Sequence, residues 1–217
     1  MKPQCNTSTI WSPELAYAIG LIVTDGNLSP DERHISFTSK DEELINHFIH
    51  CLHLHCKVYK KSSGSVREKC YYVAQFSDVN FYRFLLDIGL MSRKTKIVGK
   101  LEIPKKYFFD FLRGHFDGDG CFYSYWDPRW PSSHMFYISF ASASLKHLHW
   151  LQARLKEYVN IHGHITHSKA ASCYQLKFAK RESRVLISKI YYKKSLKSLT
   201  RKRLKINSAL AIIAKPN

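Results

Sequence analysis

Two stretches, AIGLIVTDG at Ala18–Gly26 and LRGHFDGDG at Leu112–Gly120, decide the fold of this 217-residue chain. Each is a largely apolar run with an internal glycine, Gly20 or Gly114, and each ends in Asp-Gly at the same spacing beyond that glycine. A glycine inside a helix costs about 1 kcal/mol relative to alanine, and it is easiest to explain where another backbone comes close. We therefore expect two helices that pack tightly against each other at Gly20 and Gly114.

The residues that flank both stretches support helices. Ser12 and Pro13 suit the N-cap and the first turn of a helix that runs to the first Asp-Gly, and Pro104 begins the second run. Gly26 and Gly120 predict left-handed residues that end the two helices.

Packing the helices in this way places the acids that end them, Asp25 and Asp119, beside each other. A carboxylate at a helix C-terminus opposes the helix dipole, and two neighbouring carboxylates repel each other. A divalent cation with oxygen ligands relieves both problems, so the pair predicts a metal site for Mg²⁺ (or Mn²⁺). The alternative is that each Asp-Gly is only a turn after a core helix, which the two matched copies make the weaker interpretation.

Both stretches resemble the signature helix of the LAGLIDADG homing endonucleases, and the double motif resembles the monomeric, two-repeat members of that family. In the family the last acid of each motif binds the catalytic metal, which implies this role for Asp25 and Asp119. The first motif has Val23 where an earlier acid is common, whereas the second keeps Asp117, but this is not the metal-binding position. The resemblance implies two sheets that straddle DNA as a pseudo-twofold saddle.

The expected elements repeat along the chain. After its motif helix (Pro13–Asp25), the first half predicts a turn at Asn27–Asp31, a strand at His34–Ser39, a helix at Asp41–Leu54, strands at Lys57–Lys61 and Cys70–Ser77 with SSGS (Ser62–Ser65) between them, and a helix at Val79–Ile88. The second half predicts strands at Cys121–Trp126 and Met135–Ser142, joined by a connection that holds Asp127, Pro128, Trp130 and Pro131. These are followed by a helix at Leu145–Tyr158 and by strands at His162–Ser168 and Cys173–Ala179. The half ends with a helix at Glu182–Tyr191 and a last helix that runs to Ala214. ISFTS at Ile35–Ser39 also matches ISFAS at Ile138–Ser142. The chain therefore predicts an α+β fold of two pseudo-symmetric αββαββα repeats with antiparallel sheets, residues 1–100 and residues 101–217, the second with a basic C-terminal helix.

Side chains alternate between the two faces of a strand, which predicts a polar face on each sheet. A face that bears lysine, glutamine and tyrosine can reach phosphates and base edges in the major groove of double-stranded DNA. The alternative is an ordinary solvent-exposed face. The candidate DNA-binding residues are Lys57, Tyr59, Lys61, Tyr71, Gln75, Tyr123, Tyr125, Gln175 and Lys177.

Two basic stretches occupy equivalent places after the sheet of each repeat, SRKTKIVGK at residues 92–100 and YYKKSLKSLTRKRLK at residues 191–205. In the related endonucleases a lysine in this region lies near the scissile phosphates. Lys94 and Lys202, each after an arginine, are the candidates for this catalytic role. The alternative is plain phosphate binding that holds the DNA in place.

The charge of the chain favours a polyanionic partner. The formal net charge is +17, of which residues 1–100 contribute +3 and residues 101–217 contribute +14. So large an excess favours nucleic acid over a generally basic, solvated surface. No apolar run is long enough for a membrane span and the N-terminus has no secretory apolar core. We therefore expect an intracellular protein without a membrane, and the compartment stays open.

The six cysteines form no C-x-x-C pair, which predicts free thiols. His47 and Cys51 share one face of the expected helix, so a zinc site is conceivable there. No second ligand pair lies at a standard spacing, and the apolar residues Leu44, Phe48 and Leu52 already explain an amphipathic helix. The amphipathic helix is the favoured interpretation.

Together these features predict a monomer that hydrolyses phosphodiester bonds of double-stranded DNA at a long recognition site, with metal held by Asp25 and Asp119. No nucleophilic triad, phosphate-binding loop or dinucleotide fingerprint competes with this reading. One alternative is an RNA-binding maturase that assists intron splicing, which the basic surface fits equally well. Another is a DNA-binding regulator on the same fold, against which the presence of both acids argues.

Overall fold

The computed structural model describes residues 7–63, 66–168 and 172–214. The first half holds α1 (Pro13–Asp25), β1 (Gly26–Leu28), β2 (His34–Ser39), α2 (Glu42–Cys51), β3 (Val58–Ser63), β4 (Val66–Ser77), α3 (Val79–Asp87) and the short 3₁₀ turn η1 (Lys94–Lys96). The second half holds the 3₁₀ turn η2 (Lys105–Tyr107), α4 (Phe108–Asp119), β5 (Gly120–Asp127), β6 (Trp130–Ser142), α5 (Leu145–Val159), β7 (His164–Ser168), β8 (Cys173–Phe178), α6 (Lys180–Ile190) and α7 (Thr200–Ala214). Part of the expected Ser62–Ser65 connection, and Cys5, lie outside the described residues.

The strands form two four-stranded antiparallel sheets with the same topology, in the orders β1-β2-β4-β3 and β5-β6-β8-β7. The register repeats as well, because Phe37 of β2 pairs with Gly26 while Phe140 of β6 pairs with Gly120. The matched sequences ISFTS and ISFAS therefore form equivalent strands. The predicted α+β fold of two αββαββα repeats is confirmed.

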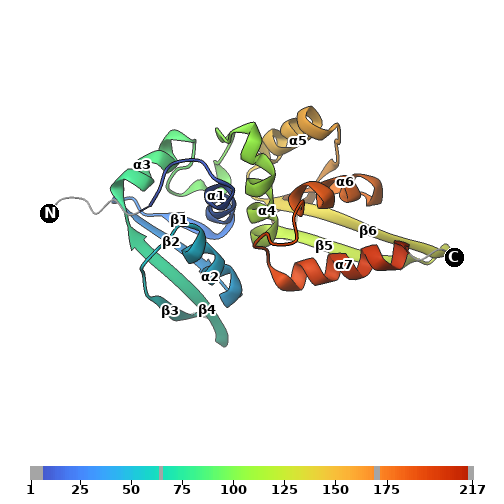
Figure 1. Ribbon diagram of the computed structural model, residues 1–217, viewed down its shortest axis with the longest axis horizontal. Helices are drawn as coiled ribbons and strands as arrows, with labels where there is room; N and C mark the ends of the chain where they lie inside the picture. The colour runs from blue at the N-terminus through green and yellow to red at the C-terminus, as the bar shows by residue number, and fades with distance from the viewer. Residues whose placement is uncertain (1–6, 64–65, 169–171, 215–217) are drawn as a thin grey trace.

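The two motif helices form the centre of the molecule. Figure 1 shows α1 and α4 side by side, with the sheet of the first repeat on one side of them and the sheet of the second repeat on the other. Ser12 caps α1 as expected, since its side-chain oxygen accepts a hydrogen bond from the backbone N–H of Leu15 at 3.1 Å. The packing of α1 on α4 therefore fixes the positions of the residues at the C-terminal ends of the two motifs.

Each sheet buries the face that its helices cover. In the first repeat, α2 packs on β2 and β4, and the rings of Phe37 and Phe48 lie 4.8 Å apart in the core. In the second repeat, α5, α6 and α7 all pack on β6, where Ile138 and Phe140 are fully buried. Within the described part of the chain, no helix has the length and apolar character to cross a membrane.

The expected left-handed ends of the two motif helices are wrong. Gly26 has φ −84° and ψ 153°, and Gly120 has φ −74° and ψ 151°, so both are extended. A Cβ on Gly26 would lie 2.6 Å from the Cα of Ile22, and one on Gly120 would lie 2.5 Å from the carbonyl oxygen of Phe116. Glycine is needed here because the chain turns straight into a strand that folds back over the last helical turn. The turn expected at Asn27–Asp31 begins later than predicted, because Gly26–Leu28 form β1 and the turn itself lies at Pro30 and Asp31.

The hairpin between β5 and β6 is tighter than the sequence suggested. Trp130 and Pro131 were expected in the connection but belong to β6. The backbone N–H of Arg129 donates to the carboxylate of Asp127 at 2.9 Å, which closes a short turn. The two strands therefore extend further than their counterparts in the first repeat.

The segment that joins the repeats is tied to the second one. Ser144 donates a hydrogen bond from its hydroxyl to the carbonyl oxygen of Val98 at 2.5 Å, and Nδ1 of His147 lies 3.0 Å from the carbonyl oxygen of Gly99. Residues 98 and 99 thus lie against the start of α5. The division into residues 1–100 and residues 101–217 stays a prediction.

Candidate functional site

The backbones of α1 and α4 touch at the two motif glycines. A Cβ on Gly20 would lie 2.2 Å from the carbonyl oxygen of Phe111, and a Cβ on Gly114 would lie 2.0 Å from the carbonyl oxygen of Tyr17. Real Cβ atoms do not approach backbone atoms so closely, so only glycine fits at either position. The structure thus brings together the two glycines that the sequence singled out.

The two helices run in the same direction, so their C-terminal ends meet. One turn beyond the paired glycines, Thr24 of α1 packs against Gly118 of α4, where a Cβ would lie 2.1 Å from the Thr24 hydroxyl. The next residues outward are Asp25 and Asp119, and both are exposed to solvent. Partial burial, and after it repulsion from the nearby Asp119 carboxylate, raises the pKa of Asp25 to about 6. Partial burial also raises the pKa of Asp119.

A buried lysine stands beside each acid. The ammonium of Lys94 donates to the carbonyl oxygen of Gly26, directly after Asp25, and the ammonium of Lys202 donates to the equivalent carbonyl oxygen of Gly120 at 2.6 Å. Burial lowers the pKa of each lysine to about 8, although both acids act in the opposite direction on Lys94. Lys94 is 6% exposed and Lys202 is 8% exposed.

The two lysines differ in how completely they are held. Besides Gly120, Lys202 donates to the carbonyl oxygens of Phe116 at 2.6 Å, Asp117 at 2.9 Å and Gly118 at 3.0 Å. An ammonium has three N–H donors, so these four acceptors saturate it and cap the C-terminus of α4. Among the described residues, the ammonium of Lys94 has a single acceptor, Gly26, and keeps donors free.

Asp117, the earlier acid of the second motif, forms buried hydrogen bonds that join parts of the structure. It is fully buried, and its Oδ2 accepts hydrogen bonds from the hydroxyl of Tyr17 at 2.8 Å and from the backbone N–H of Leu199 at 2.9 Å. Burial raises its pKa to about 6. Asp117 therefore joins α4 to α1 and to the segment before α7, and Val23 takes the matching place in the first motif as a buried apolar residue.

The polar face of the first sheet forms a groove of about 290 Å³. Three candidate DNA contacts line it, Tyr59, Lys61 and Gln75, and the Tyr59 hydroxyl donates to the side-chain oxygen of Gln75 at 3.0 Å. Tyr71 pairs with Lys61 on the same face, while Lys57 precedes β3. The first sheet thus gathers most of its candidates on one surface.

The polar face of the second sheet forms a larger groove of about 570 Å³. All four candidates of this repeat line it, namely Tyr123, Tyr125, Gln175 and Lys177. Tyr125 stacks on Tyr137 with ring centroids 6.3 Å apart, which gives this groove an aromatic wall.

Sequence reasoning missed several residues that line the two grooves. The missed residues are Asn27, Ser29, His34, Ile35, Ser36 and Thr38 in the first groove and Cys121, Tyr137 and Ser139 in the second. Strand alternation was the available signal for most of them, because Ser36 and Thr38 alternate with the buried Ile35 and Phe37. Asn27 was missed because its segment was expected to be a turn.

The helix HFIHC does not assemble a zinc site among the described residues. No group of three or more histidine, cysteine or acidic side chains there is placed to hold a metal ion. Burial raises the pKa of the Cys51 thiol to about 12, which opposes the thiolate form that binds zinc. Leu44 and Phe48 are buried, as the amphipathic helix requires. The five described cysteines are free thiols.

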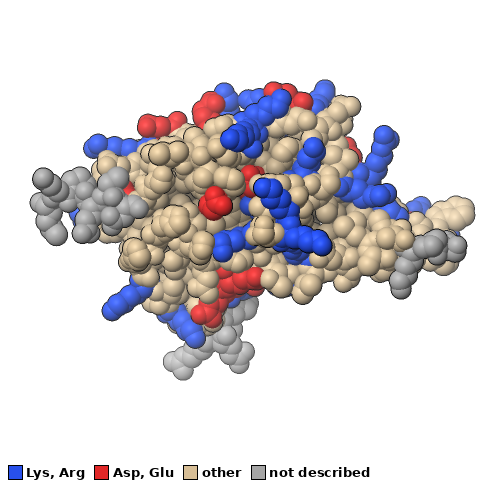
Figure 2. All heavy atoms as spheres, in the orientation of Figure 1, with Lys and Arg blue, Asp and Glu red and all other residues tan. Residues whose placement is uncertain are grey.

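Positive charge gathers on the second repeat. Figure 2 shows many more lysine and arginine than acidic side chains on the half of this face where Figure 1 places α6 and α7. The distribution agrees with the unequal charge of the two halves of the sequence.

Comparison with known proteins finds one family model that matches part of the chain. Residues 12–89 match the model of the LAGLIDADG-like domain. No curated protein matches the chain.

Solved structures share the fold at low sequence identity. The homing endonuclease I-WcaI bound to its DNA recognition sequence is 15% identical, with a TM-score of 0.66 over 92% of this chain and 88% of that one. Full-length DUF199/WhiA from Thermatoga maritima is 17% identical, with a TM-score of 0.60 over 97% of this chain, which spans only 64% of that protein. I-DmoI in complex with DNA and Mn is 14% identical, with a TM-score of 0.54 over 85% of this chain and 98% of that one. Residues 12–89 thus match the LAGLIDADG-like domain, and the whole chain shares the fold of the two-motif LAGLIDADG homing endonucleases.

Proposed function

We propose that the chain is a monomeric, site-specific homing endonuclease that hydrolyses phosphodiester bonds of double-stranded DNA with a divalent metal, Mg²⁺ or Mn²⁺. WhiA and the homing endonucleases share this fold, so cleavage has to be inferred from the site. The observation that carries the proposal is the paired arrangement of Asp25 and Asp119, each followed by a glycine whose carbonyl oxygen accepts from a buried lysine.

The residues at the helix ends fit a hard divalent cation. Asp25 and Asp119 supply carboxylate oxygens at the negative ends of two helix dipoles, and partial burial raises the pKa of both acids, so a bound cation would stabilise their charged forms. Oxygen donors of this kind suit Mg²⁺ or Mn²⁺. The bound metal would supply Lewis-acid polarisation of the scissile phosphate and a more acidic bound water.

The remaining groups position the substrate and balance charge. The two buried ammonium groups lie close enough to both acids to oppose the rise of their pKa values, and they partly balance the negative charge of the cluster. Lys94 has donors left to hold a phosphate oxygen or a water, whereas Lys202 is saturated. We therefore assign Lys94 to the reaction and Lys202 to the support of the second motif helix.

Recognition falls to the two grooves on the sheets. Lysine, glutamine and tyrosine side chains in both grooves can donate to phosphates and base edges. The two sheets lie on either side of the motif helices α1 and α4 (Figure 1), so one duplex would contact both grooves while its backbone passes the helix ends. Two repeats in one chain supply both half-sites, which favours a monomer. A known protein of this fold, I-WcaI, is bound to its DNA recognition sequence.

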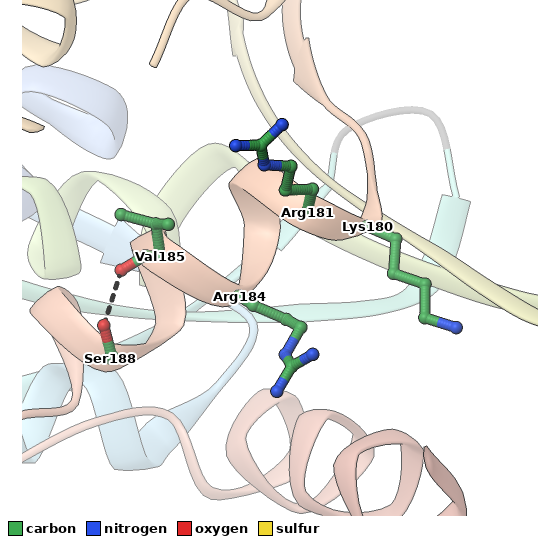
Figure 3. Close-up of a pocket in the computed structure, with 5 residues that line it drawn as sticks. All are labelled: Lys180, Arg181, Arg184, Val185 and Ser188. Carbon is green, nitrogen blue, oxygen red and sulfur yellow. Dashed lines mark hydrogen bonds between the residues drawn. The ribbon is translucent and has the colours of Figure 1, made fainter. Parts of the chain in front are cut away.

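An RNA-binding maturase is the second candidate. The observation that favours it is the concentration of basic side chains on α6, namely Lys180, Arg181 and Arg184 (Figure 3), outside the two sheet grooves. The two functions are not exclusive, since they would use different surfaces.

The experiment that tests cleavage uses a randomised library of double-stranded DNA incubated with the protein and Mg²⁺, followed by sequencing of the new ends. EDTA and the double variant Asp25→Asn/Asp119→Asn are the controls. Defined ends that need metal and vanish in the double variant, while DNA binding persists, are expected. Absence of such ends from a library that the protein demonstrably binds would refute the endonuclease and move RNA binding to first place.

A further inference from the structure

The first turn of α7 is held by the first repeat. Figure 1 shows α7 beginning near the centre of the molecule, beside α2, and running outward along the second sheet. The guanidinium of Arg201 donates to both carboxylate oxygens of Asp41, from Nε at 3.0 Å and from Nη2 at 2.8 Å. These bonds hold the pKa of the Asp41 carboxyl below its usual range. A bidentate contact of this kind fixes the direction of the arginine as well as its distance.

A second acid at the start of α2 binds the same end of α7. The carboxylate of Glu43 accepts hydrogen bonds from the backbone N–H of Thr200 at 3.0 Å and from the Thr200 hydroxyl. Thr200 is the first residue of α7, and the first N–H groups of a helix have no partner within it. A carboxylate at this position also interacts favourably with the helix dipole. A residue 157 positions earlier in the chain therefore caps α7.

The same turn of α7 also reaches the end of α4. The ammonium of Lys202 donates to the carbonyl oxygens on both sides of Asp119, those of Gly118 at 3.0 Å and Gly120 at 2.6 Å. Lys202 follows Arg201 directly, so the residue that binds α4 is covalently joined to a residue that binds the first repeat. A shift of the first turn of α7 would thus move the ammonium away from the backbone that carries Asp119.

Four consecutive residues divide between the two repeats. Leu199 donates its backbone N–H to the buried Asp117 of α4 at 2.9 Å, and Lys202 binds the end of that helix. Between them, Thr200 and Arg201 contact the start of α2. We call the hydrogen bonds of Thr200 and Arg201 to the two acids at the start of α2 the α2–α7 contact. It joins the first repeat to the end of the second motif helix.

The Asp25 side of the site has no counterpart of this contact. Lys94 also follows an arginine, but Arg93 is exposed and forms no ion pair with any residue that the structure describes. Lys94 itself lies in a single 3₁₀ turn. The α2–α7 contact therefore acts on the Asp119 side of the site.

We propose that Asp41 and Glu43 are positioning residues for the second catalytic centre, because they hold the first turn of α7 and, through Lys202, the helix end that carries Asp119. A catalytic centre at Asp119 is part of the proposed function, on which this inference rests. The side chain of Arg201 is 62% exposed, and exposed ion pairs contribute little to global stability. The contact is therefore expected to govern the position of Asp119 rather than the stability of the fold.

The test uses three variants. Asp41→Ala/Glu43→Ala removes the α2–α7 contact. Asp41→Asn/Glu43→Gln removes the same charge but keeps an oxygen acceptor at each position, which separates the contact from any effect of charge at the start of α2. Glu157→Ala removes an exposed ion pair within α5, with Arg154 at 2.5 Å, and controls for the loss of a surface pair. Melting temperatures verify that all three variants fold.

Hydrogen–deuterium exchange followed by mass spectrometry measures the link between the repeats without cleavage. In the alanine variant, the backbone N–H groups in the last turn of α4 are expected to exchange about three- to tenfold faster, because α7 loses its cap and Lys202 is held less firmly. The N–H groups in the last turn of α1 should keep the wild-type rate. Both helix ends should exchange like wild type in the Glu157→Ala control.

Strand-specific cleavage measures the consequence for the site. On the target found by library sequencing, the alanine variant should slow cleavage of one strand about tenfold more than cleavage of the other. The slowed strand should be the one that Lys94→Met affects less. The amide variant should recover most of this loss, and Glu157→Ala should cut like wild type.

Failure of the inference and failure of the proposed function give different results. The inference is overturned if exchange at the ends of α1 and α4 is accelerated equally, if neither end changes, or if both strands are slowed alike. It is also overturned if the amide variant loses as much as the alanine variant. If the wild type cuts no target while only the end of α4 exchanges faster, the proposed function fails and the link between the repeats stands.

Discussion

Replacement of Lys202 by methionine is expected to destabilise the protein much more than the same change at Lys94. Methionine keeps the length and the apolar stem of lysine but removes the ammonium. The Lys202 ammonium donates to four carbonyl oxygens at 2.6–3.0 Å, while that of Lys94 donates to one. Both side chains are buried to nearly the same extent, so the two variants differ mainly in the number of carbonyls left without a donor.

The size of the effect follows from these contacts. A hydrogen bond to a charged group contributes about 1.5–3 kcal/mol, but four bonds to one ammonium are not additive, and removing a buried charge recovers part of its desolvation cost. We expect Lys202→Met to lower the free energy of unfolding by about 2–4 kcal/mol and Lys94→Met by about 1 kcal/mol. Urea unfolding followed by tryptophan fluorescence, with linear extrapolation to water, measures both values. Equal losses in the two variants, or no loss for Lys202→Met, would refute the assignment of Lys202 as the cap of α4.

Three further outcomes are expected. Gly114→Ala should cost about 1–3 kcal/mol or more in stability, because its Cβ would lie 2.0 Å from a backbone oxygen of α1; Gly99→Ala, with nothing within 4 Å, is the matched control in thermal melts. Burial lowers the pKa of His147 to about 4 and that of the stacked His115 well below its ordinary value, so the unfolded chain binds more protons at these two sites and their contribution to stability falls as the pH drops from 6.5 toward 4, opposite in sign to that of the aspartates with raised pKa values. His115→Phe should reduce that loss in urea titrations across this range, and an unchanged pH dependence would contradict it. Lys94→Met should slow metal-dependent cleavage of one DNA strand more than the other, which strand-specific end labelling detects; a uniform slowing of both strands would count against a local role.

The sequence predicted the elements that carry a strong periodic signal. Both motif helices, the matched strands and the polar faces of the sheets were foreseen because apolar spacing and alternation follow directly from helix and strand geometry. The left-handed ends expected at Gly26 and Gly120 were wrong, since Asp-Gly after a helix also suits a chain that folds back without a positive φ. The second repeat contained the signal for this, because its strand was expected directly after Asp119 and Gly120. By analogy, a strand could have been expected directly after Asp25 and Gly26 as well.

The asymmetry of the two lysines could not be predicted from the sequence. Lys94 and Lys202 have matching neighbours, each after an arginine in a basic stretch. They differ in the element to which each belongs: Lys94 begins a single 3₁₀ turn (η1), whereas Lys202 lies in the first turn of a full helix (α7). The rigid helix fixes the Lys202 stem under the end of α4. Such a difference depends on contacts between residues more than eighty positions apart, which no local pattern encodes.

The positions where the repeats agree and differ indicate how the site works. Both repeats have glycine, at Gly20 and Gly114, where the two motif helices form one interface. A larger side chain at either position would push the other helix away. Divergence appears where each half acts alone, as at Val23 and Asp117. If one lysine is locked into a cap while its counterpart retains free donors, the two centres differ chemically although their acids are equivalent. Two unequal centres in one rigid chain would cut the two strands at different rates, so a nicked duplex should accumulate during cleavage by the wild-type protein.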